Sequence, residues 1–200
     1  AMACYFWMIG IRKMKPDPTM LCNGMLAGLV AITAPCAFVT SAGACIIGII
    51  SGILVVEAVF FVDRVLKVDD PVGAVSVHGV NGAFGVICVG LFADGSYGDG
   101  LNGVAGGVTG LFYGGGSGQL FAQLLGVLSC VLYLAPAGYI VFKVSDIIAG
   151  IRVPVSVEIE GLDLPEMGVP GYSGVVLDKA SETPLPQDGT PSPAAVKVSV

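Results

Sequence analysis

The stretch PVGAVSVHGVNGAFGVICVGLFA, residues 71–93, decides the fold of this chain. It contains no charged residue and carries the chain's one histidine, His78. As a single helix of about 23 residues it would be about 34 Å long, enough to cross the hydrocarbon core of a bilayer. An ionisable group at mid-depth in such a span marks a candidate pathway or relay, because a group of this kind is costly to bury in lipid.

The composition predicts a membrane protein. Hydrophobic residues make up 54% of the 200 residues and charged residues 12%, and the mean hydropathy is +0.87. A soluble domain of this length could not bury so much apolar surface. The formal net charge of -6, with no basic patch, excludes nucleic acid as a partner because phosphate binding needs clustered Lys and Arg.

The cysteines and glycines are interpreted as packing residues. Six cysteines lie in or beside apolar segments without a CxxC pair, so we expect small core side chains, no disulfide framework, no metal site and no cofactor. Gly24 with Gly28, and Gly48 with Gly52, have the four-residue spacing that lets helices approach closely in lipid.

Four complete spans and one broken span are predicted. The uncharged complete spans cover residues 21–39, 43–62, 71–93 and 119–142. The opening apolar run, residues 1–11, is too short to cross a membrane, which indicates that the chain is a fragment. A native interfacial helix is the alternative, but it would carry a polar face that this run lacks. Residues 101–118 are uncharged and Gly-rich, typical of an ordered connector.

The basic residues predict the orientation. If the spans alternate in direction, every basic residue as far as residue 152 falls on one side of the membrane: Arg12, Lys13, Lys15, Arg64, Lys67, Lys143 and Arg152. By the positive-inside rule this side is cytoplasmic, and it includes the C-terminus. The expected location is a cell membrane, either a bacterial inner membrane or a plasma membrane, crossed several times.

These patterns predict an all-α, polytopic helical membrane protein in three regions. Residues 1–150 form a transmembrane helical bundle, and residues 151–174 form an acidic soluble region. Residues 175–200 contain Pro184, Pro186, Pro191 and Pro193 among Ser, Thr and Lys, a composition that cannot build a core and predicts a disordered tail.

The start of the His78 helix is predicted to be capped. Asp69 and Asp70 complement the positive end of the helix dipole, and Pro71 suits a first helical turn, so all three are read as structural. Glu57 lies inside an apolar span, and we expect it either to reach the interface or to meet a partner outside this chain.

Three strings resemble the ammonium transporter family (Amt, Mep and Rh proteins), on its Amt side: NGMLAGLVAITAPCAFV at 23–39, VDDPVGAVSVHGVNGAFG at 68–85 and GLFYGGGSGQL at 110–120. A fourth, IRVPVSVEIEGLDLPEMG at 151–168, resembles the cytoplasmic C-terminal region of that family. The resemblance covers the chain to about Tyr172. It implies an eleven-helix protomer of a homotrimer, with this chain supplying the end of the seventh helix and the eighth to eleventh.

The resemblance also implies roles for single residues. His78 matches the second of two pore histidines that would act on ammonium or ammonia in a narrow hydrophobic pore, and the apolar surroundings of His78, Val75 among them, favour a neutral imidazole. Thr33 matches a threonine whose hydroxyl lies near the ammonia path. The alternative for Thr33 is a hydrogen bond to its own backbone.

The acidic region is implied to be regulatory. Gly161, Leu162 and Asp163 match the element through which this region packs on the cytoplasmic face and couples subunits, where a PII-type signal protein would dock. Met167 departs from the pattern, since many family members carry histidine there.

Three classes of function remain to compare. An ammonium transporter or channel is favoured. A membrane sensor of ammonium using the same pore is the alternative, weakened by the short tail after Gly174. An enzyme or a haem protein is not expected, because the chain has no second histidine and no paired intramembrane carboxylates.

Overall fold

The structure is a computed structural model that describes residues 1–96, 106–169, 175–177 and 184–186. It divides into two compact units, Ala1–Ala135 (unit 1) and Pro136–Val200 (unit 2), which are treated separately below. Three of the described helices are long and apolar enough to cross a membrane. The predicted helical membrane protein is therefore confirmed.

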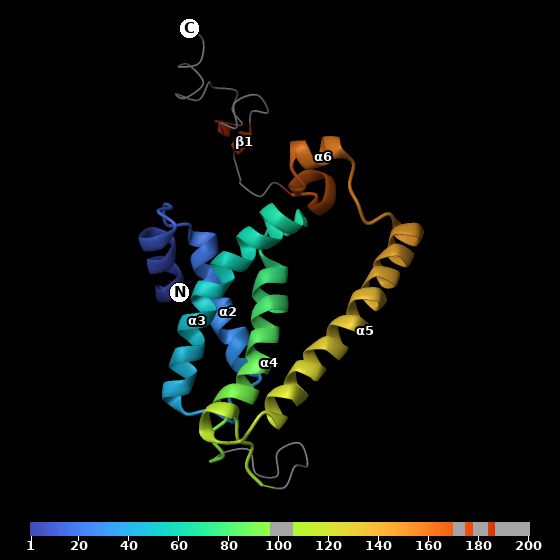
Figure 1. Cartoon of the computed structure of the whole chain (residues 1–200). Helices are drawn as coiled ribbons and strands as arrows, with labels where there is room; N and C mark the ends of the chain where they lie inside the picture. The colour runs from blue at the N-terminus through green and yellow to red at the C-terminus, as the bar shows by residue number, and fades with distance from the viewer. Residues whose placement is uncertain (97–105, 170–174, 178–183, 187–200) are drawn as a thin grey trace. The chain divides into compact units, whose positions relative to one another are not determined.

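Unit 1 is a bundle of antiparallel and parallel helices (Figure 1). Its elements are α1 (Met2–Phe6), η1 (Trp7–Ile11), α2 (Pro18–Thr33), α3 (Ser41–Phe60), η2 (Phe61–Leu66), η3 (Val75–Val80), α4 (Asn81–Phe92), η5 (Leu111–Tyr113) and the first part of α5 (Gly118–Ala149). The η1, η2 and η3 segments are π-helical turns, and η5 is a 3₁₀ turn.

One predicted span is shorter than expected. Residues 21–39 were predicted to cross the membrane, but α2 ends at Thr33 and has 16 residues, below the length of a crossing helix. Pro35 explains the end, because proline has no N–H with which to extend the helical ladder. The chain continues as turns, with the Phe38 N–H donating to the Pro35 carbonyl at 2.8 Å.

Polar side chains begin two of the helices. Asp17 accepts from the Thr19 N–H at 2.8 Å before α2, and Thr40 accepts from the Gly43 N–H at 3.1 Å before α3. Each satisfies a backbone donor that the first helical turn leaves unpaired. The crossing helix then runs through α3 and η2, Ser41–Leu66, four residues further than predicted.

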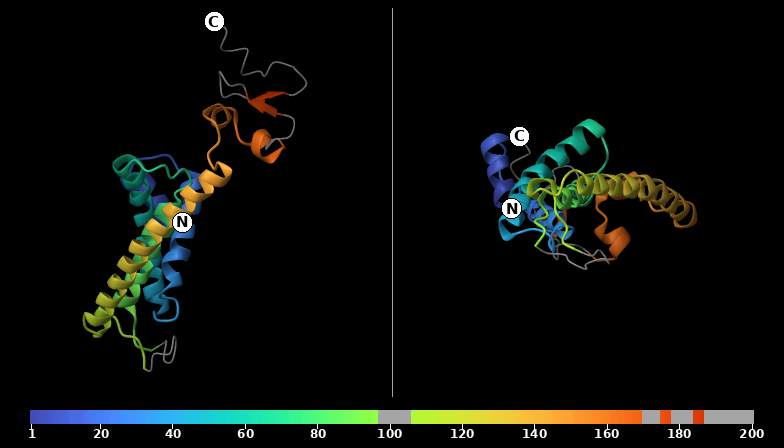
Figure 2. Two further views of the ribbon diagram at one scale, coloured as in Figure 1. Left: turned by 90° about the vertical axis from the view of Figure 1, so that its right-hand side faces the viewer. Right: turned by 60° about the horizontal axis from the view of Figure 1, so that its bottom comes forward.

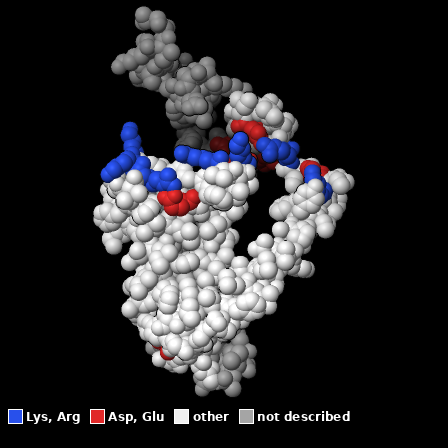
Figure 3. Space-filling view, in the orientation of Figure 1, with Lys and Arg blue, Asp and Glu red and all other residues white. Residues whose placement is uncertain are grey.

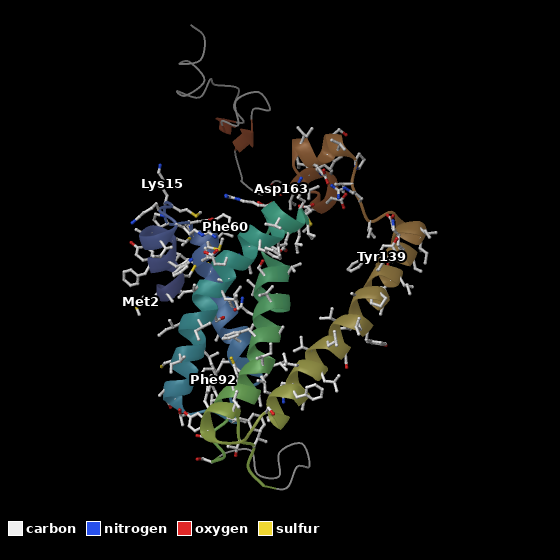
Figure 4. The ribbon with its side chains drawn as sticks, in the orientation of Figure 1. Met2, Lys15, Phe60, Phe92, Tyr139 and Asp163 are labelled. Carbon is white, nitrogen blue, oxygen red and sulfur yellow. The ribbon has the colours of Figure 1, made fainter. Side chains whose placement is uncertain are left out.

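Helices α2, α3 and α4 lie side by side in both views (Figures 1 and 2). Asn23 bonds to Val72 near one end, and Gly85 sits against the Ala31 carbonyl further along, so α2 and α4 run in the same direction. α3 runs the opposite way. Figure 4 places Lys15 and Phe60 at one end of this bundle and Phe92 at the other.

The opening run packs as a helix on α2 and α3. Cys4 and Met8 are fully buried there, in a cluster with Val55, Val56 and Val77. A Cβ added at Gly24 would lie 2.6 Å from Cys4 Cβ, and one at Gly52 would lie 3.1 Å from Ala3 Cβ. One glycine of each predicted pair, Gly24 and Gly52, therefore allows a neighbouring helix to pack closely. The other glycine of each pair, Gly28 and Gly48, has nothing within 4 Å of an added Cβ.

The cysteines are only partly core residues. Cys4 and Cys88 are buried, but the other four are exposed: Cys22, Cys36, Cys45 and Cys130. The prediction of six core cysteines was therefore wrong for this chain taken alone. All six are free thiols.

The segment after α4 is an ordered connector where it is described. Asp94 forms an antiparallel bridge with Thr109, and the Gly110 N–H donates to the Ala93 carbonyl at 2.7 Å. η5 follows, and Phe112 makes an edge-to-face contact with Phe92. The rest of the predicted connector, residues 101–105, lies outside the described residues.

Helix α5 has 32 residues, contains Pro136 and begins and ends outside the predicted bounds of 119–142. Unit 2 takes its last part, then α6 (Val155–Glu160) and the π-helical turn η6 (Asp163–Met167). Two short strands, β1 (Val175–Leu177) and β2 (Pro184–Pro186), pair antiparallel within the region predicted to be disordered. The remainder of that tail lies outside the described residues.

Candidate functional site

His78 lies in the π-helical turn η3 that leads into α4. Its side chain is exposed, as is Val75 one turn earlier, while Ser76 and Val77 on the opposite side are buried against unit 1. Residues three apart share a helix face. The structure therefore brings His78 and Val75 together on a face that no described part of unit 1 covers.

The helix of His78 is shorter than predicted, yet His78 is level with the middle of the neighbouring Ser41–Leu66 span. It runs from Val75 to Phe92, 18 residues, so His78 falls in its first turn. Gly73 lies against Val59, and Asn81 bonds to Ser51 on the antiparallel helix α3. His78, between these two contacts, is level with about residue 54, the middle of the Ser41–Leu66 span.

A turn carries the chain to this depth before the helix begins. Gly73 has φ +72°, a left-handed conformation that stops a helix, so Pro71 lies in the turn and the prediction of a first helical turn at Pro71 was wrong. Asp70 accepts from the Val75 N–H at 3.0 Å, which is a capping contact. Asp69 is exposed and makes no contact of this kind in the described chain.

Asn23 holds the same turn from α2. Its side-chain amide donates to the Val72 carbonyl at 3.1 Å, and a Cβ at Gly73 would lie 2.7 Å from that amide nitrogen. Only glycine fits here, because the position demands both a positive φ and the space that a methyl group would fill.

Thr33 is not brought to His78. The Thr33 hydroxyl donates to the Leu29 carbonyl at 2.8 Å, the backbone contact that the alternative interpretation expects. Ala31 is opposite Gly85, seven residues beyond His78, so Thr33 lies more than about 10 Å further along the bundle. The oxygen lone pairs of Thr33 remain exposed.

A buried polar cluster lies behind His78, and the sequence did not predict it. Ser51, Ser76 and Asn81 are all 0% exposed. The Ser51 hydroxyl donates to Asn81 Oδ1 at 2.7 Å, and Asn81 Nδ2 donates to the Ser76 carbonyl at 2.9 Å. One signal could have suggested the cluster: Ser51 and Asn81 are polar residues in otherwise apolar spans.

Comparison with known proteins identifies the family. The model of the Ammonium Transporter Family matches residues 1–172. The chain belongs to the ammonium transporter family. It is 40% identical over 177 residues to ammonium transporter Amt2 of Archaeoglobus fulgidus, covering 88% of this chain and 36% of that protein. It is 37% identical over 188 residues to an ammonium transporter of Mycobacterium bovis, covering 93% of this chain and 38% of that protein.

Solved structures share the fold. Saccharomyces cerevisiae Mep2 matches with a TM-score of 0.66 at 24% identity, covering 78% of this chain and 34% of that chain. Candida albicans Mep2 matches with the same TM-score of 0.66, covering 93% and 41%. This ammonium transporter family chain therefore spans a little over a third of the length of the relatives it matches.

Glu57 of this family member finds partners within the chain. Trp7 Nε1 and Arg12 Nε donate to Glu57 Oε1 at 2.6 and 2.7 Å, and a second Arg12 nitrogen donates to Glu57 Oε2. Arg12 and Arg64 also lie over the Phe60 ring, at 5.0 and 4.5 Å from its centroid. Neither of the two alternatives expected for Glu57, reaching the interface or meeting a partner outside the chain, named these residues, since sequence spacing does not reveal which helices meet.

The predicted regulatory residues lie in unit 2. Gly161 ends α6 with φ +105°, Leu162 is 45% exposed, and Asp163 begins η6. Arg152 bonds to Glu158 at 2.8 Å across the start of this segment. Unit 2 also has a pocket of about 220 Å³, lined by Tyr139, Phe142, Lys143, Asp146, Ile151 and Arg152, that contains none of the predicted residues.

No group of three or more metal-ligating side chains occurs in the described residues. Val75 and Gly79, its neighbours on the helix, are uncharged, and among the described residues the His78 side chain makes no hydrogen bond or ion pair. The arrangement can exchange a hydrogen bond or a proton with a small polar solute on the open face.

Proposed function

We propose that this chain forms part of a path by which ammonium or ammonia crosses the membrane, with the His78 imidazole handling the solute's hydrogen. The observation that carries the proposal is the position of His78: exposed, level with the middle of the Ser41–Leu66 span, on a face shared with Val75 and opposite the chain's own core. Membership of the ammonium transporter family and relatives named as ammonium transporters support the substrate.

Physical chemistry favours a relay over passage of the bare ion. Moving a compact cation into hydrocarbon has an idealised desolvation cost of tens of kcal/mol unless charge compensates it. Val75 and Gly79, which flank His78 on the helix, offer no charge. A neutral imidazole accepts a hydrogen bond at one nitrogen and donates at the other, so it can take a proton from ammonium and guide ammonia onward.

Thr33 is proposed as a second residue on the path. Its hydroxyl hydrogen is engaged by the Leu29 carbonyl, which leaves the exposed oxygen as an acceptor. An acceptor suits ammonia, whose N–H groups donate. At its distance from His78 it would act at a separate step of passage.

The proposed orientation rests on the basic residues, and the proposed assembly rests on the family resemblance. We place the basic end of unit 1 in the cytoplasm by the positive-inside rule, with the C-terminus on the same side. A homotrimer with one path per subunit is proposed, and a PII-type protein docking at Gly161, Leu162 and Asp163 would regulate it. The exposure of Leu162 supports a contact surface at that element.

Uptake measurements on the full protein test the relay. In cells without their own ammonium transporters, His78→Ala is expected to lower ammonium uptake by about 10- to 100-fold, the value of a lost hydrogen bond to a charged group. The amount of protein in the membrane is measured alongside, and Val65→Ala, an exposed apolar change on η2, serves as the control. Uptake unchanged by His78→Ala would refute the relay, and ligand binding without uptake in the unaltered protein would favour the sensor.

A further inference from the structure

The turn that carries His78 is wider than an α-helical turn. η3 is π-helical over Val75–Val80, and the Asn81 N–H donates to both the Ser76 and His78 carbonyls. Turns of this kind are rare in proteins generally and are frequent at functional sites. This chain has others, so the question at η3 is which contacts favour the wide turn over an α-helical one.

Asn81 favours the π-helical turn over an α-helical turn through hydrogen bonds from both its backbone and its side chain. Nδ2 donates at 2.9 Å to the Ser76 carbonyl, the same oxygen that accepts the Asn81 backbone N–H across the wide turn. In an α-helix the Asn81 N–H would bond instead to the carbonyl four residues earlier. Two donors of Asn81, its backbone N–H and Nδ2, therefore bond to the carbonyl five residues earlier and stabilise the wide turn.

Ser51 on α3 fixes the direction of the Asn81 amide. Its hydroxyl donates at 2.7 Å to Oδ1, which turns Nδ2 toward Ser76. All three residues are fully buried, so water does not compete for these hydrogen bonds. The α3 helix thus determines the conformation of a turn on a different helix.

We propose that Asn81 is a positioning residue for His78: clamped between Ser51 and the Ser76 carbonyl, it keeps η3 wide and so sets the direction of the imidazole on the open face. Loss of the clamp lets the turn tighten, and one residue of helical register corresponds to a rotation of about 100°. The link to transport rests on the proposed function above, whereas the positioning of the ring does not.

The test measures the ¹⁵N NMR signal of the His78 imidazole. The full protein is labelled with ¹⁵N-histidine and placed in lipid bilayers, and the His78 signal is the one that is absent from the spectrum of His78→Ala. Asn81→Leu keeps a similar side-chain volume and removes both hydrogen bonds. It is expected to shift or split the His78 signal and to lower ammonium uptake by about tenfold at an equal membrane level.

Ser76→Ala is the matched control. The Ser76 hydroxyl is buried in the same turn and has no hydrogen-bond partner among the described residues, while the carbonyl that Asn81 uses stays in place. We expect this variant to leave the His78 signal unchanged. Should Asn81→Leu fail to insert, Ser51→Ala removes one of the two contacts and is expected to shift the signal in the same direction by a smaller amount.

The outcomes separate the two proposals. An unchanged His78 signal in Asn81→Leu, or in Ser51→Ala where that variant is used, overturns the positioning role, and so does an equal change in Ser76→Ala. A shifted signal with unaltered uptake supports positioning and contradicts the role of His78 in transport.

Discussion

At the scale of single residues, Glu57 illustrates how an acidic side chain is held inside an apolar helix. Trp7 and Arg12, from a segment more than forty residues earlier, donate to both of its oxygens. The two side chains of the ion pair are 37% and 38% exposed, so solvent weakens their attraction. The contact fastens the opening helix to α3 near the basic end of the bundle.

Glu57→Gln is expected to lower the stability of the protein by about 1 kcal/mol, because the amide still accepts from Trp7 but loses the charge that pairs with Arg12. Thermal unfolding in detergent measures the change. Asp63→Asn removes a carboxylate from the following turn η2, where the described chain offers it no ion pair, and should have little effect. Equal losses in both variants would contradict a specific role for the Glu57 contact.

Sequence reasoning singled out His78 and Asp70 but missed the partners of Glu57 and Asn81. The reason is physical: His78 stands out as an ionisable group in an apolar run, and Asp70 acts on backbone a few residues away. Glu57 and Asn81 bond across helices, to Arg12 and Ser51. Which faces of two uniformly apolar helices meet is not encoded in either helix's own pattern.

At the scale of elements, Gly85 sets how closely α4 approaches α2. A Cβ at this position would lie 2.3 Å from the Ala31 carbonyl oxygen, which belongs to backbone and cannot rotate away. The two helices therefore pack with main chain against main chain. Small residues at such crossings are the common means of helix association in lipid.

Gly85→Ala is expected to destabilise the protein by about 1–3 kcal/mol, because the helices must separate to admit the methyl group. Gly28→Ala on α2 is the matched control, since nothing lies within 4 Å of the Cβ it would add. Its higher helix propensity should leave stability unchanged or slightly raised. Unfolding midpoints in detergent compare the two, and a Gly85→Ala variant as stable as Gly28→Ala would refute the close packing.

Helix existence was predictable from the sequence, whereas helix ends were not. Apolar runs without charge indicate spans, but the start of η3 depends on the positive φ of Gly73 and on the Asn23 contact to the turn before it. Proline also misled: Pro71 was expected inside a helix, and the span predicted at 21–39 was carried past Pro35. Both lie at turns that fix where helices begin or stop.

At the scale of the whole molecule, charge marks one end of unit 1. Figure 3 shows basic side chains gathered there, over the end that Figure 4 labels with Lys15 and Phe60. Asp94, in the connector, follows α4 at the other end near Phe92. This asymmetry is the physical basis for the cytoplasmic placement proposed above.

Cysteine labelling tests that placement. In a background with the native cysteines replaced, the six of this chain among them, Lys67→Cys is expected to react with a membrane-impermeant reagent only when the cytoplasmic face is opened, and Ser96→Cys is expected to react in intact cells. Both positions are exposed. The reverse pattern would invert the proposed orientation.

The early end of α2 has a consequence for how this chain sits in lipid. A helix of 16 residues is about 24 Å long, shorter than a hydrocarbon core of about 30 Å, so α2 alone does not cross that core. Irregular backbone that follows such a helix in a membrane needs protein groups to satisfy its hydrogen bonds wherever water is absent. The Asp94 N–H, donating to the Phe38 carbonyl at 3.0 Å, provides one such partner for the turns after Thr33.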